Sequence, residues 1–149
     1  MVLVMVSIAP SLHANINPSI ETGHFSLVGE GQLKWFGMTV YNARLYAPGG
    51  AYQSDQPHAI EITYKFGFSR EQLARKTLEE IERLHGNRPD RPALLELFEA
   101  VFPDVARGDQ IIAVHHPGRD VEFYAGDVLL GRIVDAELAE MFFAIWLDP

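Results

Sequence analysis

Tyrosine and arginine side chains on two expected strands carry the clearest chemistry in this sequence. Tyr41, Arg44, Tyr46 and Tyr64 place phenols and a guanidinium within segments that are otherwise largely apolar. An arginine can hold a carboxylate through two parallel hydrogen bonds, and a phenol can donate one more. An apolar cleft with a few such polar groups is the usual form of a small-molecule site. The alternative is that these are amphipathic side chains at strand edges, with apolar bodies on the sheet and polar tips in water.

Other residue types that often carry out chemistry are absent or do not have the spacing of a metal or catalytic site. Cysteine is absent, which excludes zinc-thiolate sites, thiol nucleophiles and disulfides. His115 and His116 are adjacent on an expected strand, so they point to opposite faces and cannot easily chelate one metal ion. Asp104 and Asp109 flank a loop that offers too few oxygen ligands for a cation cage. No GxSxG nucleophile elbow is present. We therefore expect no metal site and no cofactor, and we assign no catalytic residue.

Length and composition indicate one globular domain. The chain has 149 residues, of which 48% are apolar and 21% charged, and its net charge is −8. No stretch of sequence concentrates basic residues. This charge balance argues against nucleic acid and against anionic lipid surfaces as partners.

The N-terminal segment has features of an export signal. Met1 to Pro10 is apolar but too short to span a bilayer, so no integral membrane segment is expected. Leu12-His13-Ala14 has the form of a cleavage site, although no Lys or Arg precedes Lys34 to supply the positive start of a signal peptide. We expect residues 1–22 to be a leader, formed by a truncated signal peptide and a linker, and residues 23–149 to be the domain. The expected location is periplasmic or secreted.

Hydrophobic periodicity predicts segregated strands and helices. We expect strands over residues 25–30, 33–36, 38–46, 59–66, 111–115, 121–124 and 128–130, and helices over 70–85, 91–102 and 136–147. Gly29-Glu30-Gly31 is expected to form a hairpin turn. This order of strands, two helices, a strand meander and a last helix indicates an α+β fold with an antiparallel sheet.

Capping residues and strand parity add local detail. Ser69 with Gln72 has the form of a capping box, and Asp90 and Asp135 are expected N-caps of the two later helices. On the strand over 38–46, alternation places Tyr41 on one face and Arg44 on the other.

Several stretches together resemble the bacterial chalcone isomerase-like family. They are GQLKWFGMTVYNARLY (31–46), VFPDVARGD (101–109), GDQIIAVHHPG (108–118), VEFYAGDVLLGRIVD (121–135) and FFAIWLDP (142–149). The resemblance covers roughly residues 25–149. It implies an open-faced β-sandwich, an antiparallel sheet covered on one side by helices, with a ligand cleft between sheet and helices.

The catalytic pattern of the plant chalcone isomerases is not matched. Those enzymes use an early arginine, a threonine in a Lys-Phe-Thr-x-Ile-Gly-Val-Tyr run, and a tyrosine and an asparagine seven residues apart. Here the threonine position falls on Tyr41, no arginine precedes Arg44, and no tyrosine has an asparagine seven residues later. An isomerase with a rearranged site remains the alternative function, and a structural module with a filled cleft is a third.

The resemblance favours ligand binding without catalysis. Other members of the superfamily hold a fatty-acid carboxylate with an arginine and a tyrosine above an apolar pocket. Tyr41 is the expected tyrosine, and Arg44 or Lys34 the expected cation, although Lys34 lacks the planar fork of a guanidinium. We expect Tyr41, Arg44, Tyr64 and Lys34 to contact a small apolar or fatty-acid-like ligand.

Overall fold

The computed structural model describes residues 4–6 and 24–147, which form a seven-stranded antiparallel sheet and three helices. The strands are β1 (Val4–Val6), β2 (Phe25–Trp35), β3 (Met38–Pro48), β4 (His58–Tyr64), β5 (Gln110–His116), β6 (Asp120–Ala125) and β7 (Val128–Ile133). The helices are α2 (Arg70–His85), α3 (Arg91–Val101) and α4 (Ala136–Leu147). None of these helices is long and apolar enough to cross a membrane.

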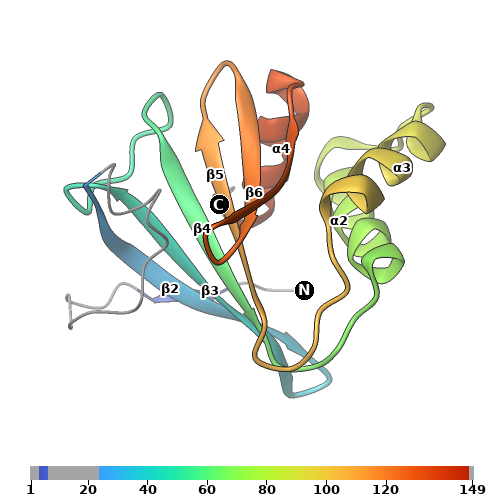
Figure 1. Cartoon of the computed structure of the whole chain (residues 1–149), viewed down its shortest axis with the longest axis horizontal. Helices are drawn as coiled ribbons and strands as arrows, with labels where there is room; N and C mark the ends of the chain where they lie inside the picture. Colours follow the sequence, from blue (N-terminus) through green and yellow to red (C-terminus); the bar gives the residue numbers. More distant parts are fainter. Residues whose placement is uncertain (1–3, 7–23, 148–149) are drawn as a thin grey trace.

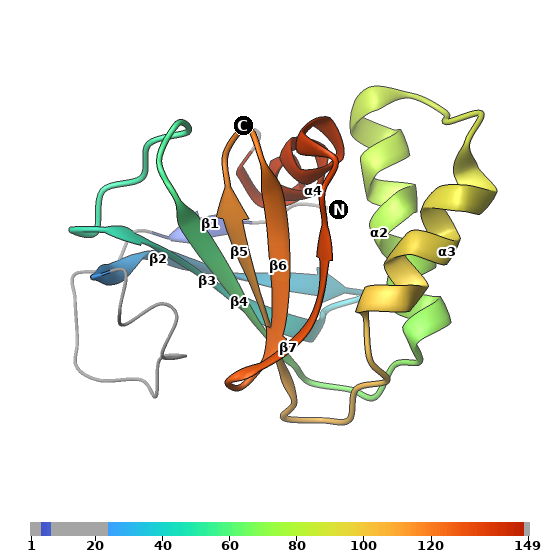
Figure 2. The same ribbon diagram turned by 45° about the horizontal axis from the view of Figure 1, so that its top comes forward.

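The strands pair in chain order, from β1 at one edge to β7 at the other. Helices α2 and α3 connect β4 to β5, which are nevertheless hydrogen-bonded neighbours. Figures 1 and 2 show that α2, α3 and α4 lie on the same side of the curved sheet. The expected α+β fold with helices covering one side of an antiparallel sheet is confirmed.

Strand alternation divides the sheet residues between two apolar clusters. The larger cluster joins the helices to one face of the sheet and includes the fully buried Ile60, Phe98, Phe123 and Phe142. The smaller cluster, on the other face, contains Tyr46, Ala59, Ile112 and Val114. A fold with one sheet face against helices needs apolar residues at every second strand position, which these strands supply.

Two of the three expected helix caps are formed. Ser69 and Gln72 make the reciprocal bonds of a capping box at the start of α2, and Asp135 accepts the amide of Leu138 at the start of α4 (3.0 Å). Asp90 occupies the N-cap position of α3 as expected, but its side chain makes no capping hydrogen bond. The Asp90 carboxylate instead accepts the guanidinium of Arg88 (3.1 Å).

The expected turn at Gly29-Glu30-Gly31 is wrong. These residues continue β2, where Glu30 lies opposite Arg44, and a register shift between Leu27 and Gly29 takes up the irregularity. Glycine tolerates the altered backbone of such a bulge, which explains why a turn-like composition can occur inside a strand.

The β2–β3 hairpin turns instead at Phe36-Gly37, where Trp35 pairs with Met38. Both turn residues have positive φ, 48° at Phe36 and 78° at Gly37, as in a two-residue hairpin of type I′. Asn, Asp or Gly is usual at the first of these positions, and a bulky residue there costs roughly 1–3 kcal/mol. Phe36 is also 95% exposed.

Part of the expected leader is described. Val4–Val6 form β1 and pair antiparallel with residues 30–32 of β2. The expected cleavage site and linker lie outside the described residues.

Candidate ligand-binding cavity

A mostly apolar cavity of about 90 Å³ lies between the helix-facing side of the sheet, α2 and α4. Its walls come from β2 to β6, the two helices and the segments beside them. The lining residues are Leu33, Val40, Tyr41, Ile62, Tyr64, Phe68, Gln72, Leu73, Lys76, Thr77, Glu80, Phe102, Ile111, Ala113, Phe123, Phe142, Ile145 and Trp146. An apolar concavity with a few polar groups is the usual form of a small-molecule site.

Tyr41 and Tyr64 bring two phenols to this cavity from neighbouring strands. They are directly opposite each other in the β3–β4 pairing, so their side chains emerge on the same face. Their rings meet edge to face with centroids 6.0 Å apart. The pairing of β3 with β4 therefore fixes the spacing of the two hydroxyl-bearing rings.

Helix α4 positions a third polar aromatic group. Trp146 lies in its last turn and donates its indole N–H to the hydroxyl oxygen of Tyr41 over 3.0 Å. This bond orients the Tyr41 hydroxyl and leaves its proton able to donate to a ligand. Among the described residues the Tyr64 hydroxyl has no hydrogen-bond partner, and it too can donate.

Burial keeps both phenols protonated. Desolvation is the largest cause of the raised pKa of Tyr41, which the indole of Trp146 partly offsets and the Glu80 carboxylate reinforces. Desolvation also raises the pKa of Tyr64, with Tyr41 adding a smaller effect. Both groups are therefore neutral hydrogen-bond donors at ordinary pH, which suits them to bind an anion or a carbonyl oxygen.

One face of α2 supplies the remaining polar lining. Gln72, Lys76, Thr77 and Glu80 lie within the first three turns of the helix and all line the cavity. The Lys76 ammonium lies 3.2 Å from Glu79, and the Glu80 carboxylate accepts the guanidinium of Arg83 over 3.0 Å. With Glu80 paired to Arg83, Lys76 is the cation that this wall brings to the cavity.

Of the four residues expected to bind ligand, the structure brings two to the cavity. Tyr41 and Tyr64 line it, whereas Arg44 and Lys34 are not among its lining residues. Arg44 lies on the other face of the sheet, where its guanidinium is 3.1 Å from Glu30. Lys34 is exposed near the β2–β3 hairpin. A ligand role for any of the four stays a prediction.

Trp146 and Lys76 also line the cavity but were not among the residues expected from the sequence. Tyr41 and Trp146 are 105 positions apart, and no local pattern shows that they meet. Amphipathic periodicity does place Lys76 and Glu80 on one side of the helix, four residues apart.

The two adjacent histidines separate as expected. His115 is buried on the helix-facing side, where its ring stacks on Phe143 with centroids 4.7 Å apart. It also lines a more open pocket with His58, between the β3–β4 loop, the β5–β6 turn and α4. His115 Nδ1 lies 3.1 Å from His58 Nε2.

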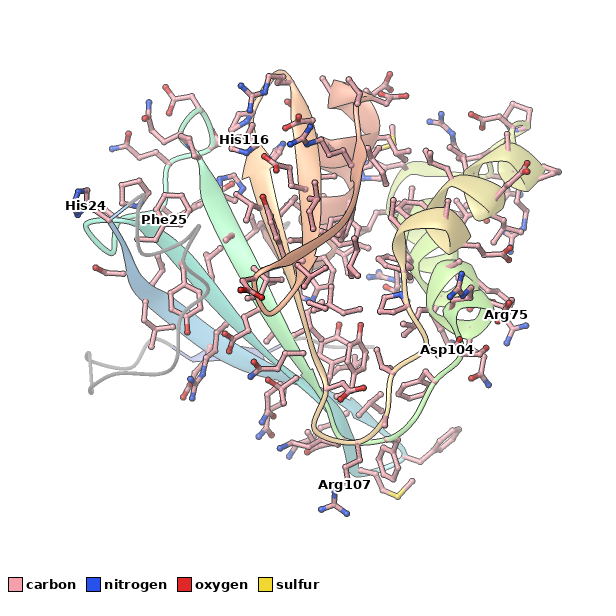
Figure 3. The ribbon with its side chains drawn as sticks, viewed as in Figure 1. His24, Phe25, Arg75, Asp104, Arg107 and His116 are labelled. Atoms are coloured by element: carbon pink, nitrogen blue, oxygen red, sulfur yellow. The ribbon has the colours of Figure 1, made fainter. Side chains whose placement is uncertain are left out.

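His116 lies with Asp120 and Glu122 on the other face of the sheet, and their possible ligand atoms fall within 4.8 Å of one another. Figure 3 labels His116 at the end of β5. The His116 and Tyr124 side chains each contact a different Glu122 oxygen at 2.6 Å, and Arg132 lies 3.3 Å from the second oxygen. The Glu122 carboxylate is therefore satisfied by its protein partners.

The family comparison agrees with this architecture. The profile of the family described as "Chalcone isomerase-like" matches residues 14–149. The chain belongs to the chalcone isomerase-like family. The resemblance to the chalcone isomerase-like family is thus confirmed, and the cavity between sheet and helices lies where that resemblance implied a cleft.

A solved structure shares the fold. The crystal structure of a fatty-acid binding protein from Arabidopsis thaliana superposes with a TM-score of 0.68 at 15% sequence identity. The match covers 98% of this chain and 90% of that one. No protein among those with curated functions matches the chain. At this low identity the likeness shows the fold, and the ligand must be argued from the cavity.

Proposed function

We propose that this chalcone isomerase-like protein binds a small apolar ligand with a carboxylate head, such as a fatty acid, without turning it over. The observation that carries the proposal is the pair of protonated phenols, Tyr41 and Tyr64, on an otherwise apolar cavity. The Arabidopsis protein that shares this fold is a fatty-acid binding protein, which supports the same ligand class.

A carboxylate suits the polar groups of this cavity. Each of its oxygens accepts hydrogen bonds, and Tyr41 and Tyr64 can each donate one. Lys76 adds a positive charge from α2. A hydrogen bond to a charged group is worth about 1.5–3 kcal/mol, more than a bond between neutral groups. The proposal therefore assigns the cation role to Lys76 in place of Arg44 and Lys34.

The size of the cavity limits the ligand. About 90 Å³ is well below the ~300–1,000 Å³ of a typical ligand pocket. A long acyl chain needs α2 or α4 to move away from the sheet, whereas a medium chain needs less displacement. Since each buried CH₂ contributes about 0.8 kcal/mol, affinity should rise with chain length and then level off when the cavity is full.

Calorimetric titration of delipidated protein with a saturated fatty-acid series tests the proposal. Tyr41→Phe removes one donor and should weaken binding by roughly 1.5–3 kcal/mol. Tyr46→Phe is the matched control, because Tyr46 is a buried tyrosine of the same strand on the other face of the sheet. No saturable heat, or equal affinity for wild type and Tyr41→Phe, would overturn the proposal.

The same preparation distinguishes the isomerase alternative. A chalcone cyclisation assay should give no rate above background, because donors aimed at a developing oxyanion are worth about 10²–10³ in rate each and the plant residues for this are unmatched. Cyclisation that is lost in Tyr41→Phe would instead assign the cavity to catalysis.

We also propose that the protein acts in the periplasm or is secreted. The apolar run of Met1 to Pro10, followed by Leu12-His13-Ala14, supports export.

A further inference from the structure

Exposed apolar and basic side chains gather at one end of the sheet. We define this apex by Lys34, Phe36, Met38, Lys65, Phe66 and Arg107. Phe36 is 95% exposed, Met38 57% and Phe66 43%. Isolated exposed apolar residues are ordinary on protein surfaces, but a group of them rimmed by polar residues marks an interaction site.

Backbone pairing brings the three apex segments together. Lys34 pairs with Thr39 across the β2–β3 hairpin, and the amide of Lys65 donates to the carbonyl of Val40 over 2.8 Å. The amide of Gly108, next to Arg107, donates to the backbone carbonyl of Tyr64 over 2.8 Å. Figure 3 shows Arg107 at the tip of the molecule, directed away from the body of the protein.

The apex is locally positive on an acidic chain. The whole chain has a net charge of −8, yet Lys34, Lys65 and Arg107 meet here. None of these three cations takes part in an ion pair among the described residues. One carboxylate, Asp109, lies beside them and accepts the amide of Ala106 over 2.8 Å. Cations around protruding apolar side chains are complementary to a surface that is anionic outside and apolar inside.

Phe36 gives an independent argument. Its φ of 48° is unfavourable for a bulky side chain, and its ring is almost fully exposed. Asparagine would adopt this conformation more readily. A bulky, exposed side chain in a backbone conformation that costs stability is explained if it acts on something outside the fold.

We propose that the apex docks on the surface of an anionic phospholipid bilayer, with Phe36 and Met38 entering the acyl boundary and the three basic residues contacting lipid phosphates. Leu33, Val40 and Phe68, which line the cavity, belong to the same end of the sheet. Docking would thus bring the cavity close to the membrane. That consequence rests on the proposed ligand binding, whereas the docking itself does not.

Flotation with lipid vesicles tests the docking. Wild-type protein should float with vesicles of equal parts phosphatidylglycerol and phosphatidylcholine at low salt, and less so at ~0.15 M salt because of screening. It should float poorly with phosphatidylcholine alone. Lys65→Gln should weaken binding to the anionic vesicles about fivefold, the loss expected for one basic residue near the surface.

Phe36→Asn separates docking from folding. The variant should unfold at a denaturant concentration no lower than wild type and bind vesicles at least tenfold more weakly. The matched control is Val134→Asn, because Val134 is 74% exposed but follows β7 at the opposite end of the sheet. This control should float like wild type.

Three results would overturn the docking proposal. They are no flotation of wild type with anionic vesicles, equal flotation of wild type and Phe36→Asn, and a dimer in gel filtration that Phe36→Asn dissociates. The last result would assign the apex to a contact between copies of the chain. Calorimetry of Phe36→Asn with a soluble medium-chain fatty acid should match wild type, so a failure of ligand binding is distinguished from a failure of docking.

Discussion

The buried pair His58 and His115 should make the protein lose stability as the pH falls from 7 to 5. His58 Nδ1 donates to the carbonyl of Gln56 over 2.8 Å, so its Nε2 is an acceptor. His115 Nδ1 therefore donates to His58 Nε2 over 3.1 Å, and His115 Nε2 has no hydrogen-bond partner among the described residues. Each ring is neutral in this chain of bonds. A proton on His58 Nε2 removes the acceptor of the His115 bond, and a proton on His115 Nε2 creates a buried charge with no partner.

The direction of the effect follows from the pKa shifts. Burial, with smaller repulsion from His58 and His116 and an opposing attraction from Asp120, lowers the pKa of His115 from 6.5 to about 4. Burial likewise lowers the pKa of His58, against its bond to Gln56. Between pH 6.5 and 4 the unfolded state binds more protons than the folded state, so unfolding becomes easier as the pH falls through this window.

The size follows from the same shift. At 1.36 kcal/mol per pKa unit, the His115 shift sets an upper limit of about 3.4 kcal/mol, reached at the acid end of the window. At pH 5 this shift lowers the free energy of unfolding by about 2 kcal/mol, and solvent at the pocket rim reduces that loss to about 1–2 kcal/mol. His58 titrates together with His115, so the pair shares this value.

Urea unfolding of wild type and His115→Phe at pH 7 and pH 5 measures this contribution. The variant keeps a ring against Phe143, and its loss of stability between the two pH values should be smaller than that of wild type by about 1–2 kcal/mol. His85→Gln removes an exposed histidine at the end of α2 and should keep the wild-type difference. An identical pH dependence in wild type and His115→Phe would refute the reasoning.

Three further predictions concern packing and processing. Gly131→Ala should lower the free energy of unfolding by about 1–3 kcal/mol, because the added Cβ would lie 2.8 Å from Cγ1 of Val101. Urea unfolding measures this loss, and adding Val101→Ala to the variant should restore most of it. Trp146→Ala should cost about 3–5 kcal/mol and Trp146→Phe much less, and an unchanged midpoint for the alanine variant would contradict burial of the indole. N-terminal sequencing of exported protein should show removal of residues 1 to about 14. An intact Met1 in the cytoplasmic fraction would contradict that processing.

Local sequence patterns predicted most of the elements because they report on local energetics. The capping box at Ser69 and the cap at Asp135 satisfy amide groups within four residues, and both are formed. Strand alternation correctly separated Tyr41 from Arg44. The turn prediction at Gly29 was wrong because glycine occurs in both turns and bulges, and only the pairing with the partner strand distinguishes the two.

The candidate site could be predicted only in part. Tyr41 and Tyr64 were found because each lies on a readable strand, and their pairing brings the rings together. The hydrogen bond of Tyr41 with Trp146 depends on how α4 packs, which periodicity does not reveal. The basic apex was missed for a similar reason, since Lys34, Lys65 and Arg107 are far apart in the sequence and the net charge hides their grouping.

The central claim, that an acyl chain enters the cavity, is tested most directly by fluorescence of Trp146. The chain has two tryptophans, so Trp35→Phe leaves Trp146 as the only one, and its indole lines the cavity. A fatty acid with a nitroxide quencher on its chain should quench this emission saturably, and unlabelled fatty acid of the same length should restore it. Emission that does not change at concentrations where calorimetry shows binding would place the ligand elsewhere and contradict the account.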